Sequence, residues 1–212
     1  NSIFYNKKIK ITGHTGFKGS WLSVWLSKLG AKIIGISDEV PTSPAHYEAT
    51  KGILYSDLRI DIKNSKKILS IIDEIRPSFL FHLAAQPIVL ESYKDPLTTF
   101  KINTIGTINI LDALMRINHK CIAVMITSDK CYDNVEWTYG YRETDKLGGK
   151  DPYSGSKGSA EIAIRSYVES FFKKNDSNIR LGIGRAGNVI GGGDWSPNRL
   201  IPDTINSLMK NK

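Results

Sequence analysis

The segment KIKITGHTGFKGSWLSVWLSKL, residues 8–29, decides the fold of this chain. Residues 8–12 form a short β-rich run, residues 12–19 contain three glycines, and residues 17–29 follow a helical pattern. A strand that passes through a glycine turn directly into a helix is typical of the first unit of an α/β sheet.

The three glycines of the turn TGHTGFKG have the spacing GxxGxxG. Gly13 permits the tight turn, Gly16 lets a pyrophosphate approach the backbone, and Gly19 lets the helix pack closely on the sheet. Free N–H groups at the start of the helix then face the phosphates. A glycine triplet alone is a weak signal, but between a first strand and a first helix it favours dinucleotide binding over a structural turn. The residues expected to line the cofactor here are Gly13, Thr15, Gly16, Phe17, Lys18 and Gly19.

The rest of the chain continues the alternation of β-rich runs and helical patterns. The run over 122–127 is almost continuously apolar, as expected for a strand buried on both faces. The pattern predicts an α/β fold, a doubly wound parallel sheet with helices on both faces, formed by one domain over residues 1–212. Further strands are expected at 32–36, 54–58, 79–83, 122–127 and 179–183, and further helices at 63–76, 96–116, 153–174 and from about 199.

The composition excludes several classes of function. Apolar residues make up 41% of the chain and charged residues 24%, ordinary values for a globular protein, and no apolar run is long enough to span a membrane. The net charge of +8 is spread along the chain, without the basic cluster that nucleic-acid binding requires. Cys121 and Cys131 lack metal-ligand spacing, so we expect no metal site and a reducing, cytoplasmic setting.

The chain begins with Asn1 and ends soon after the last expected helix. Open α/β sheets bind ligands at the carboxyl ends of their strands, and little sequence is left to cover a substrate there. We therefore expect the substrate-binding part of the protein to lie largely outside this chain.

Two acidic positions are candidates for the adenosine half of a dinucleotide. Asp38 lies about twenty residues beyond the glycine turn, where a carboxylate can hold a ribose 2′-hydroxyl and disfavour a 2′-phosphate, so NAD is favoured over NADP. Ser37 occupies the usual strand-end position, however, and Asp38 could equally be a solvated loop acid. Asp61 and Ile62 are expected at the adenine edge, with a helix N-cap as the alternative role for Asp61.

Two segments carry the predicted chemistry. Tyr153 and Lys157 stand four residues apart at the start of a helix, so their side chains share one face. A cation beside a phenol favours the phenolate and lowers the pKa of the tyrosine, as general-base catalysis near neutral pH requires. Alone, this pair is better explained as a helix surface. The segment Thr127–Lys130 changes that balance, because the Ser128 hydroxyl can bind the substrate oxygen that Tyr153 deprotonates.

Together these motifs resemble those of the extended short-chain dehydrogenase/reductases, which combine TGxxGxxG with a strand-end serine, YxxxK, HLAA (82–85) and Asn103 before Gly106. The resemblance covers nearly the whole chain. Within this family, four longer stretches are similar to the CDP-glucose 4,6-dehydratases. The resemblance implies a Rossmann fold, NAD as the cofactor, and a hydro-lyase whose substrate is the nucleotide sugar CDP-glucose. The stretches are GHTGFKGSWL (13–22), TSDKCYDN (127–134), DPYSGSKGSAE (151–161) and GNVIGGGDW (187–195).

The pair Asp129-Lys130 departs from the related dTDP-glucose dehydratases, which carry Asp-Glu there. In those enzymes the Glu removes the proton next to the keto group while the Asp protonates the leaving hydroxyl. By resemblance, Lys130 is then the base, which requires a pKa depressed by burial or by a nearby cation. A phosphate or structural contact is the alternative role for Lys130. Epimerases of the superfamily have neither Asp-Lys nor Asp-Glu at this position. The presence of Asp129-Lys130 therefore favours elimination over epimerisation.

The resemblance also places residues near the ligands and implies a homodimer or higher oligomer. An amide and a guanidinium suit a diphosphate, although Asn188 could instead tie down its own turn. Gln86 and Asn103 could equally satisfy backbone groups. Other open functions are a dTDP-glucose dehydratase, a UDP-sugar 4-epimerase and a non-catalytic NAD-binding regulator. The implied positions are Leu83, Ala84 and Ala85 for the cofactor and Gln86, Asn103, Asn188 and Arg199 for the substrate.

Overall fold

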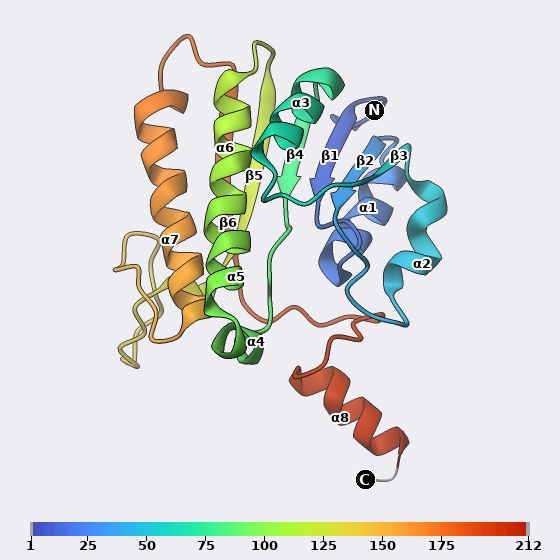
Figure 1. The fold of residues 1–212 in the computed structure, drawn as a ribbon, viewed down its shortest axis with the longest axis vertical. Coiled ribbons are helices and arrows are strands. Elements are labelled where there is room, and N and C mark those ends of the chain that lie inside the picture. Colours follow the sequence, from blue (N-terminus) through green and yellow to red (C-terminus); the bar gives the residue numbers. More distant parts are fainter. Residues whose placement is uncertain (1, 211–212) are drawn as a thin grey trace.

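The computed structural model describes residues 2–210 and contains one six-stranded sheet (Figure 1). All strands are parallel, in the order β3-β2-β1-β4-β5-β6. This order confirms the predicted doubly wound sheet. The strands are β1 (Lys8–Thr12), β2 (Lys32–Ser37), β3 (Ser56–Arg59), β4 (Phe79–His82), β5 (Cys121–Ser128) and β6 (Ile179–Ala186).

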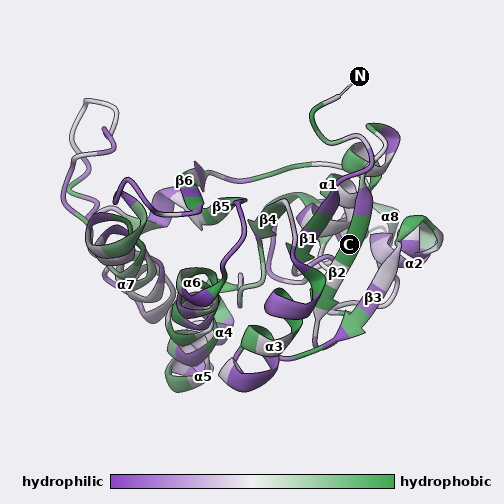
Figure 2. Cartoon of the chain, turned by 90° about the horizontal axis from the view of Figure 1, so that it is seen from above, coloured by the Kyte–Doolittle hydropathy of each residue, from purple (hydrophilic) through white to green (hydrophobic). Residues whose placement is uncertain are grey.

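Helices cover both faces of the sheet. Figure 2 shows α3 (Ser65–Ile75), α6 (Thr107–Arg116) and α7 (Pro152–Tyr167) on one face, with α1 (Phe17–Lys28) on the other. Beyond the carboxyl ends of the strands, α8 (Leu200–Met209) projects away from the sheet (Figure 1). Shorter helices are α2 (His46–Thr50), α4 (Val89–Lys94) and α5 (Pro96–Phe100), with 3₁₀ turns at Lys51–Ile53 and Asp129–Cys131.

Two of the long predicted helices contain π-helical turns. The helix expected over 96–116 is α5, a π-helical turn at Lys101–Gly106, and α6 in succession. The helix expected over 153–174 is α7 followed by a π-helical turn at Val168–Phe172. The sequence did not predict α2 and α4, which have five and six residues, because so short a segment carries no helical period.

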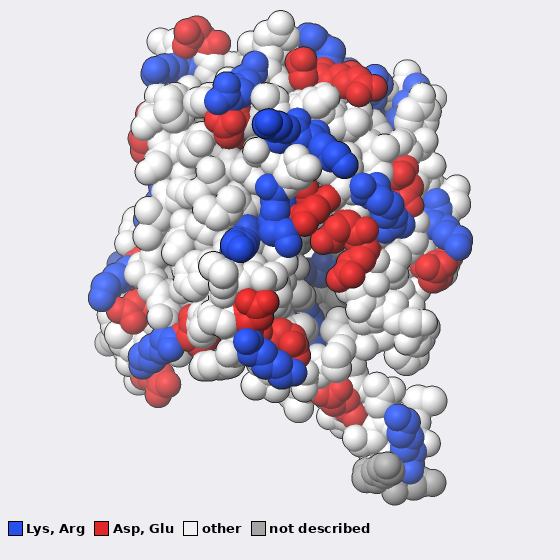
Figure 3. Space-filling model, in the orientation of Figure 1, with Lys and Arg blue, Asp and Glu red and all other residues white. Residues whose placement is uncertain are grey.

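Charges of both signs lie side by side on the surface. Over the face in Figure 3, lysine and arginine side chains are interspersed with aspartate and glutamate. Within residues 2–210, no helix has the length and apolar character that crossing a membrane requires.

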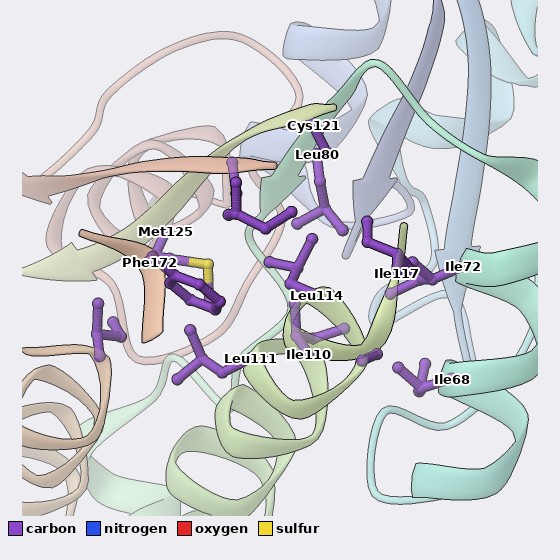
Figure 4. Close-up of a cluster of buried hydrophobic side chains, with 14 of the residues drawn as sticks. Ile68, Ile72, Leu80, Ile110, Leu111, Leu114, Ile117, Cys121, Met125 and Phe172 are labelled. Carbon is purple, nitrogen blue, oxygen red and sulfur yellow. The ribbon is translucent and has the colours of Figure 1, made fainter. Parts of the chain in front are cut away.

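The larger hydrophobic core lies between the sheet and the helices α3, α6 and α7 (Figure 4). Leu80 and Met125 from the strands meet Ile72 of α3 and Leu114 of α6, and all four are fully buried. Each such side chain contributes roughly 1.5–3 kcal/mol through removal from water. This packing holds α3, α6 and α7 against one face of the sheet.

The strand connections determine where a ligand can bind. The chain leaves β1 for β2 on one side, whereas β4 pairs with β1 on the other side. Thr12, at the end of β1, therefore stands between Ile36 and His82. In doubly wound folds, ligands bind at this switch in direction, at the carboxyl ends of the strands.

Candidate cofactor and active site

The three glycines of the first turn have different structural reasons. Gly13 has a φ of +74°, and a Cβ there would lie 2.7 Å from the Ala84 nitrogen. A Cβ on Gly19 would lie 2.1 Å from the Gly13 carbonyl oxygen, so the start of α1 packs directly on the turn. At Gly16 the nearest atom to such a Cβ is 3.4 Å away. The protein itself requires the first and third glycines, and the middle one leaves room for a ligand, which fits a dinucleotide phosphate.

The start of α1 is also suited to an anion. Gly16 is its N-cap, no side chain caps the helix, and its first turn carries no acidic residue. Lys18 lies in this turn, and its pKa is lowered by burial first and then by the positive charge of Arg199. Helix N–H groups and a partly buried cation together favour a phosphate here.

At the end of β2, Ser37 is the last strand residue and Asp38 is exposed just beyond it. The Asp38 carboxylate accepts a hydrogen bond from the Glu39 N–H at 3.0 Å. Thr15 Oγ1 donates to the Glu39 carbonyl oxygen at 2.6 Å, which ties the glycine turn to this loop. Ser37 Oγ lies 3.2 Å from His14 Nδ1. The strand-end position thus holds a hydroxyl, as expected, and the nearest carboxylate is one residue further.

His14 does not face the expected cofactor position. Its ring is fully buried under β2, where a Cβ on Gly35 would lie 2.3 Å from it. His14 Nε2 lies 2.9 Å from the Asp57 carboxylate, which also accepts a hydrogen bond from Tyr47. Burial lowers the pKa of His14. The sequence carried one signal of this packing, since an isolated glycine inside a strand marks a close approach.

At the end of β3, Asp61 is not a helix N-cap. Asn64 caps α3 by accepting a hydrogen bond from the Lys67 N–H at 3.1 Å. The Asp61 carboxylate accepts from the Lys63 N–H at 2.8 Å and pairs with the Lys63 ammonium at 3.3 Å. The Ile62 side chain is buried in the core, so only its backbone can face a ligand. The competing role for Asp61 is therefore wrong, and its role at the adenine edge stays a prediction.

The segment after β4 forms the other wall of the cradle. The Leu83 N–H donates to the Thr12 carbonyl oxygen at 3.0 Å, and the Ala84 N–H donates to Thr12 Oγ1 at 3.3 Å. Because Ala84 also lies against Gly13, the segment running into Ala85 borders the glycine turn. The expected position of residues 83–85 beside the cofactor is thus compatible with the geometry.

Gln86 and Asn103 bind each other and the protein interior. Asn103 Oδ1 accepts from the Gln86 N–H at 2.8 Å, and its Nδ2 donates to the Gln86 carbonyl oxygen and to Ser156 Oγ. Gln86 Nε2 donates to Thr99 Oγ1 at 2.9 Å. Asn103 is 1% exposed. This arrangement favours the backbone-tying role over the active-site wall for Asn103, because its polar atoms are already bound.

Tyr153 and Lys157 lie on one face of α7, close to the end of β5. The helix begins at Pro152, and Asp151 caps it by accepting from the Ser154 N–H at 2.9 Å. Tyr153 is 8% exposed and Lys157 is 7% exposed. Lys157 Nζ lies 5.9 Å from the centre of the Tyr153 ring. The spacing therefore brings the two side chains together as predicted.

The pKa of Tyr153 differs from the sequence prediction. Burial raises the pKa of Tyr153, although a hydrogen bond with Ser128 and the charge of Arg199 oppose this rise. Burial also lowers the pKa of Lys157 to about 8, and the neighbouring ammonium of Lys18 adds to that effect. The expected lowering of the tyrosine pKa is thus wrong for this structure, because desolvation of the phenol outweighs the Ser128 hydrogen bond and the charge of Arg199.

Ser128, Asp129 and Lys130 form a turn directly after β5. Ser128 Oγ donates to Asp129 Oδ1 at 3.0 Å and accepts from the Lys130 N–H at 3.2 Å. The Lys130 ammonium lies 3.4 Å from Asp129 Oδ2, and the Lys130 side chain is 49% exposed. Lys130 is thus half-exposed and paired with a carboxylate, so the burial that could have depressed the pKa of such a base is not found.

The segment after β6 crosses the carboxyl ends of the strands toward α1 and α2 (Figure 1). Trp21 Nε1 donates to the Gly192 carbonyl oxygen at 2.9 Å, and a Cβ on Gly191 would lie 3.1 Å from the Phe17 ring. Asn188 is exposed at the start of this segment. Arg199, at the N-cap of α8, lies 3.4 Å from Asp194 Oδ2 and acts on the pKa values of Lys18 and Tyr153. Arg199 thus joins the cations around the site.

A buried ion pair that was not predicted lies behind the turn Ser128–Lys130. Glu161 of α7 is fully buried and pairs with Arg185 of β6 at 2.8 Å. Glu161 follows Lys157 by four residues, as Lys157 follows Tyr153. That repeat places all three on one helix face and could have identified Glu161.

Known proteins resemble this chain in both sequence and structure. The model of the family described as GDP-mannose 4,6 dehydratase matches residues 11–181. The CDP-glucose 4,6-dehydratase of Salmonella typhimurium is 44% identical over 218 residues, covering 100% of this chain and 60% of that enzyme.

Two solved structures share the fold. Pal from Bacillus thuringiensis has a TM-score of 0.82 at 25% identity, over 96% of this chain and 64% of Pal. The UDP-glucuronic acid 4-epimerase from Bacillus cereus, in complex with UDP-glucuronic acid and NAD, has a TM-score of 0.79 at 24% identity. That match covers 97% of this chain and 64% of the epimerase. This chain thus spans less than two thirds of the length of each of these three proteins.

Proposed function

The chain belongs to the GDP-mannose 4,6 dehydratase family, and on that premise we propose that its protein is an NAD-dependent nucleotide-sugar 4,6-dehydratase acting on CDP-glucose. The observation that carries the proposal is the gathering of Ser128, Tyr153 and Lys157 at the end of β5. The likeness to CDP-glucose 4,6-dehydratase over the whole chain supports the choice of sugar nucleotide.

NAD is the cofactor that this cradle fits. The glycine turn leaves open space at Gly16, and the uncapped start of α1 offers N–H groups to a pyrophosphate. Asp38 and the backbone around Asp61 would hold the adenosine half. Bound there, NAD⁺ would supply the hydride acceptor for oxidation of the sugar and the hydride for the later reduction.

Tyr153 performs the first proton transfer in the proposed reaction. Its phenolate takes the proton of the glucose 4-hydroxyl as carbon 4 is oxidised to a ketone. Ser128 hydrogen-bonds the same oxygen, and Lys157 stabilises the phenolate by its charge. Burial raises the pKa of Tyr153. The positive charges of Lys157 and Arg199 are therefore needed to keep the phenolate accessible near neutral pH.

Asp129 and Lys130 perform the elimination. The new ketone acidifies the hydrogen on carbon 5, which Lys130 removes, and Asp129 protonates the departing 6-hydroxyl. One water leaves, which gives a double bond between carbons 5 and 6. The hydride removed from carbon 4 would then be returned to carbon 6, and the proton held by Lys130 to carbon 5, which gives CDP-4-keto-6-deoxyglucose. Lys130 is half-exposed beside Asp129, where a sugar bound over the turn would contact both side chains. Arg199 and Asn188 would hold the diphosphate of the substrate.

The direct test is to incubate the full-length protein and NAD⁺ with CDP-glucose, dTDP-glucose and UDP-glucose separately. We expect the 4-keto-6-deoxy product from CDP-glucose. A 4-epimer from UDP-glucose, or turnover of dTDP-glucose in preference, would replace this function by the corresponding relative. NAD binding with no turnover of any sugar nucleotide would indicate a non-catalytic regulator.

Two variants test the assigned roles. Tyr153→Phe should lower the rate by about 10²–10⁴-fold, because it removes the general base. Lys130→Ala should lower the rate of elimination by a similar factor. An unchanged rate of elimination in this variant would show that Lys130 is not the base. Lys146→Ala is the matched control, since that lysine lies in the loop following the turn, with its side chain 83% exposed.

The proposal extends to assembly and location. Apolar side chains remain exposed on α4 and α5, including Leu90, Tyr93 and Leu97, with Ile162 on α7. A homodimer would bury such a surface, and size-exclusion chromatography with light scattering on the full-length protein tests it. The two cysteines are free and buried, which suits a cytoplasmic enzyme.

A further inference from the structure

Glu161 has no assigned role in the reaction, although it is 0% exposed and lies directly behind the turn Ser128–Lys130. Its Oε1 accepts hydrogen bonds from Thr127 Oγ1 at 2.6 Å and from the Cys131 thiol at 3.6 Å. Arg185 donates to Oε1 through Nε and to Oε2 through Nη2, both at 2.8 Å. One carboxylate is thus held by three different segments of the chain.

The hydrogen bonds that Glu161 accepts from Thr127 and Cys131 lie on either side of the turn Ser128–Lys130. Thr127 immediately precedes Ser128, and Cys131 immediately follows Lys130. The three residues proposed for chemistry therefore lie between two points that the same carboxylate holds. Because Glu161 belongs to α7, it also connects this turn to the helix that carries the general base.

The charge of Glu161 is balanced inside the protein. Burial by itself would raise the pKa of Glu161, but the hydrogen bonds from Arg185 and Thr127 outweigh it, and its pKa lies below the usual value. Arg185 also donates from Nη1 to the Tyr132 hydroxyl at 2.7 Å and stacks over that ring at 4.6 Å. The ion pair thus also secures the residue after Cys131.

We infer that Glu161 is a positioning residue that holds the turn Ser128–Lys130 in register with Tyr153 and Lys157. This inference rests on the proposed function for its catalytic consequence. Tyr153 and Lys157 are held by the backbone of α7 itself. Asp129 and Lys130 are about half-exposed and contact each other and Ser128, so their placement depends on the two ends of the turn. Loosening those ends impairs elimination more than oxidation.

The test compares Glu161→Gln with wild type in the full-length protein. The amide keeps the shape but loses the charge and one acceptor. We expect a fall in kcat of between about tenfold and a hundredfold, as misplaced catalytic groups cause, with KM for CDP-glucose little changed. During turnover the variant should accumulate enzyme-bound reduced cofactor, seen by its near-ultraviolet absorbance, because oxidation continues while elimination slows.

Two further variants separate positioning from general stability. Glu169→Gln changes an exposed glutamate in the π-helical turn after α7, paired with Lys173, and should leave turnover and cofactor absorbance unchanged. Thr127→Val removes one contact at the turn and keeps the buried ion pair. It should shift the steady state in the same direction by a smaller factor, and it decides the question if Glu161→Gln does not fold.

Hydrogen–deuterium exchange tests the anchoring without catalysis. Amides of residues 128–132 should exchange faster in Glu161→Gln and in Thr127→Val, since their bonds depend on a fixed turn. Unchanged exchange together with an unchanged share of reduced cofactor would overturn the inference. If wild type does not dehydrate any sugar nucleotide, the proposed function fails, and the exchange measurement alone supports or overturns the anchoring by Glu161.

Discussion

Replacing Lys10 by methionine should stabilise the protein by an amount that depends on pH. Lys10 lies on the central strand β1, is 0% exposed, and its Nζ has no hydrogen-bond partner among residues 2–210. Burial lowers its pKa from 10.5 to about 7, against the opposing effects of Cys121 and Glu74. Folding therefore removes the Lys10 ammonium group from water, which destabilises the folded protein.

The size and direction of the effect follow from the two pKa values. Between about pH 7 and 10.5 the unfolded chain binds a proton that the folded protein lacks, so the stability of wild type rises with pH across this window. The difference of about 3.5 units, at about 1.4 kcal/mol each, sets a limit of about 5 kcal/mol. The penalty is complete at and below about pH 7 and is lost toward pH 10.5.

Urea unfolding of the full-length protein across this pH range measures the effect. Lys10→Met should raise the free energy of unfolding by up to about 5 kcal/mol near pH 7, with a smaller gain as the pH rises. Lys8→Met is the matched control, because Lys8 is exposed on the same strand and face. If Lys10→Met has the same pH slope as wild type, or if its gain is equal at every pH, the penalty does not come from Lys10.

Other predictions concern the cradle and its support. Gly19→Ala places a Cβ 2.1 Å from the Gly13 carbonyl oxygen, so both the melting temperature and the affinity for NAD should fall, as calorimetry and NAD titration can record. Gly16→Ala has room for its Cβ and should keep the melting temperature while weakening NAD binding; equal NAD affinity would place the pyrophosphate elsewhere. Asn103→Leu should cost about 1–3 kcal/mol in unfolding free energy, because it leaves the partly buried N–H and carbonyl of Gln86 unpaired and removes the buried hydrogen bond to Ser156.

The sheet could be predicted because its signals are local and periodic. The apolar run of β5 and the glycine turn before α1 identify their elements from neighbouring residues, and the predicted strand positions were confirmed to within a few residues. The short helices α2 and α4 could not be found that way. The π-helical turns were also not predicted, because the wider helical turn at these positions depends on how the helix packs against its neighbours.

The candidate site was predicted less completely. The spacing of Tyr153 and Lys157 was sufficient to place them on one face of α7, and both lie there. The pKa of Tyr153 depends instead on how fully other elements bury it, and it is raised where the neighbouring lysine had predicted a lowering. Asn103 shows the same limit. Whether its side chain lines the site or binds backbone groups depends on the loop that packs against it.

The amino-acid sequence alone was sufficient to predict the order of strands and helices along the chain, the glycine turn and the shared helix face of Tyr153 and Lys157. Those features arise from backbone geometry and from residues within a turn or two of each other. Only the tertiary structure decided which charges are buried and with what partners, as for Lys10, His14 and the pair Glu161–Arg185. The electrostatic environment of a side chain is set by the atoms that displace water around it, and in a doubly wound sheet those atoms come from distant segments.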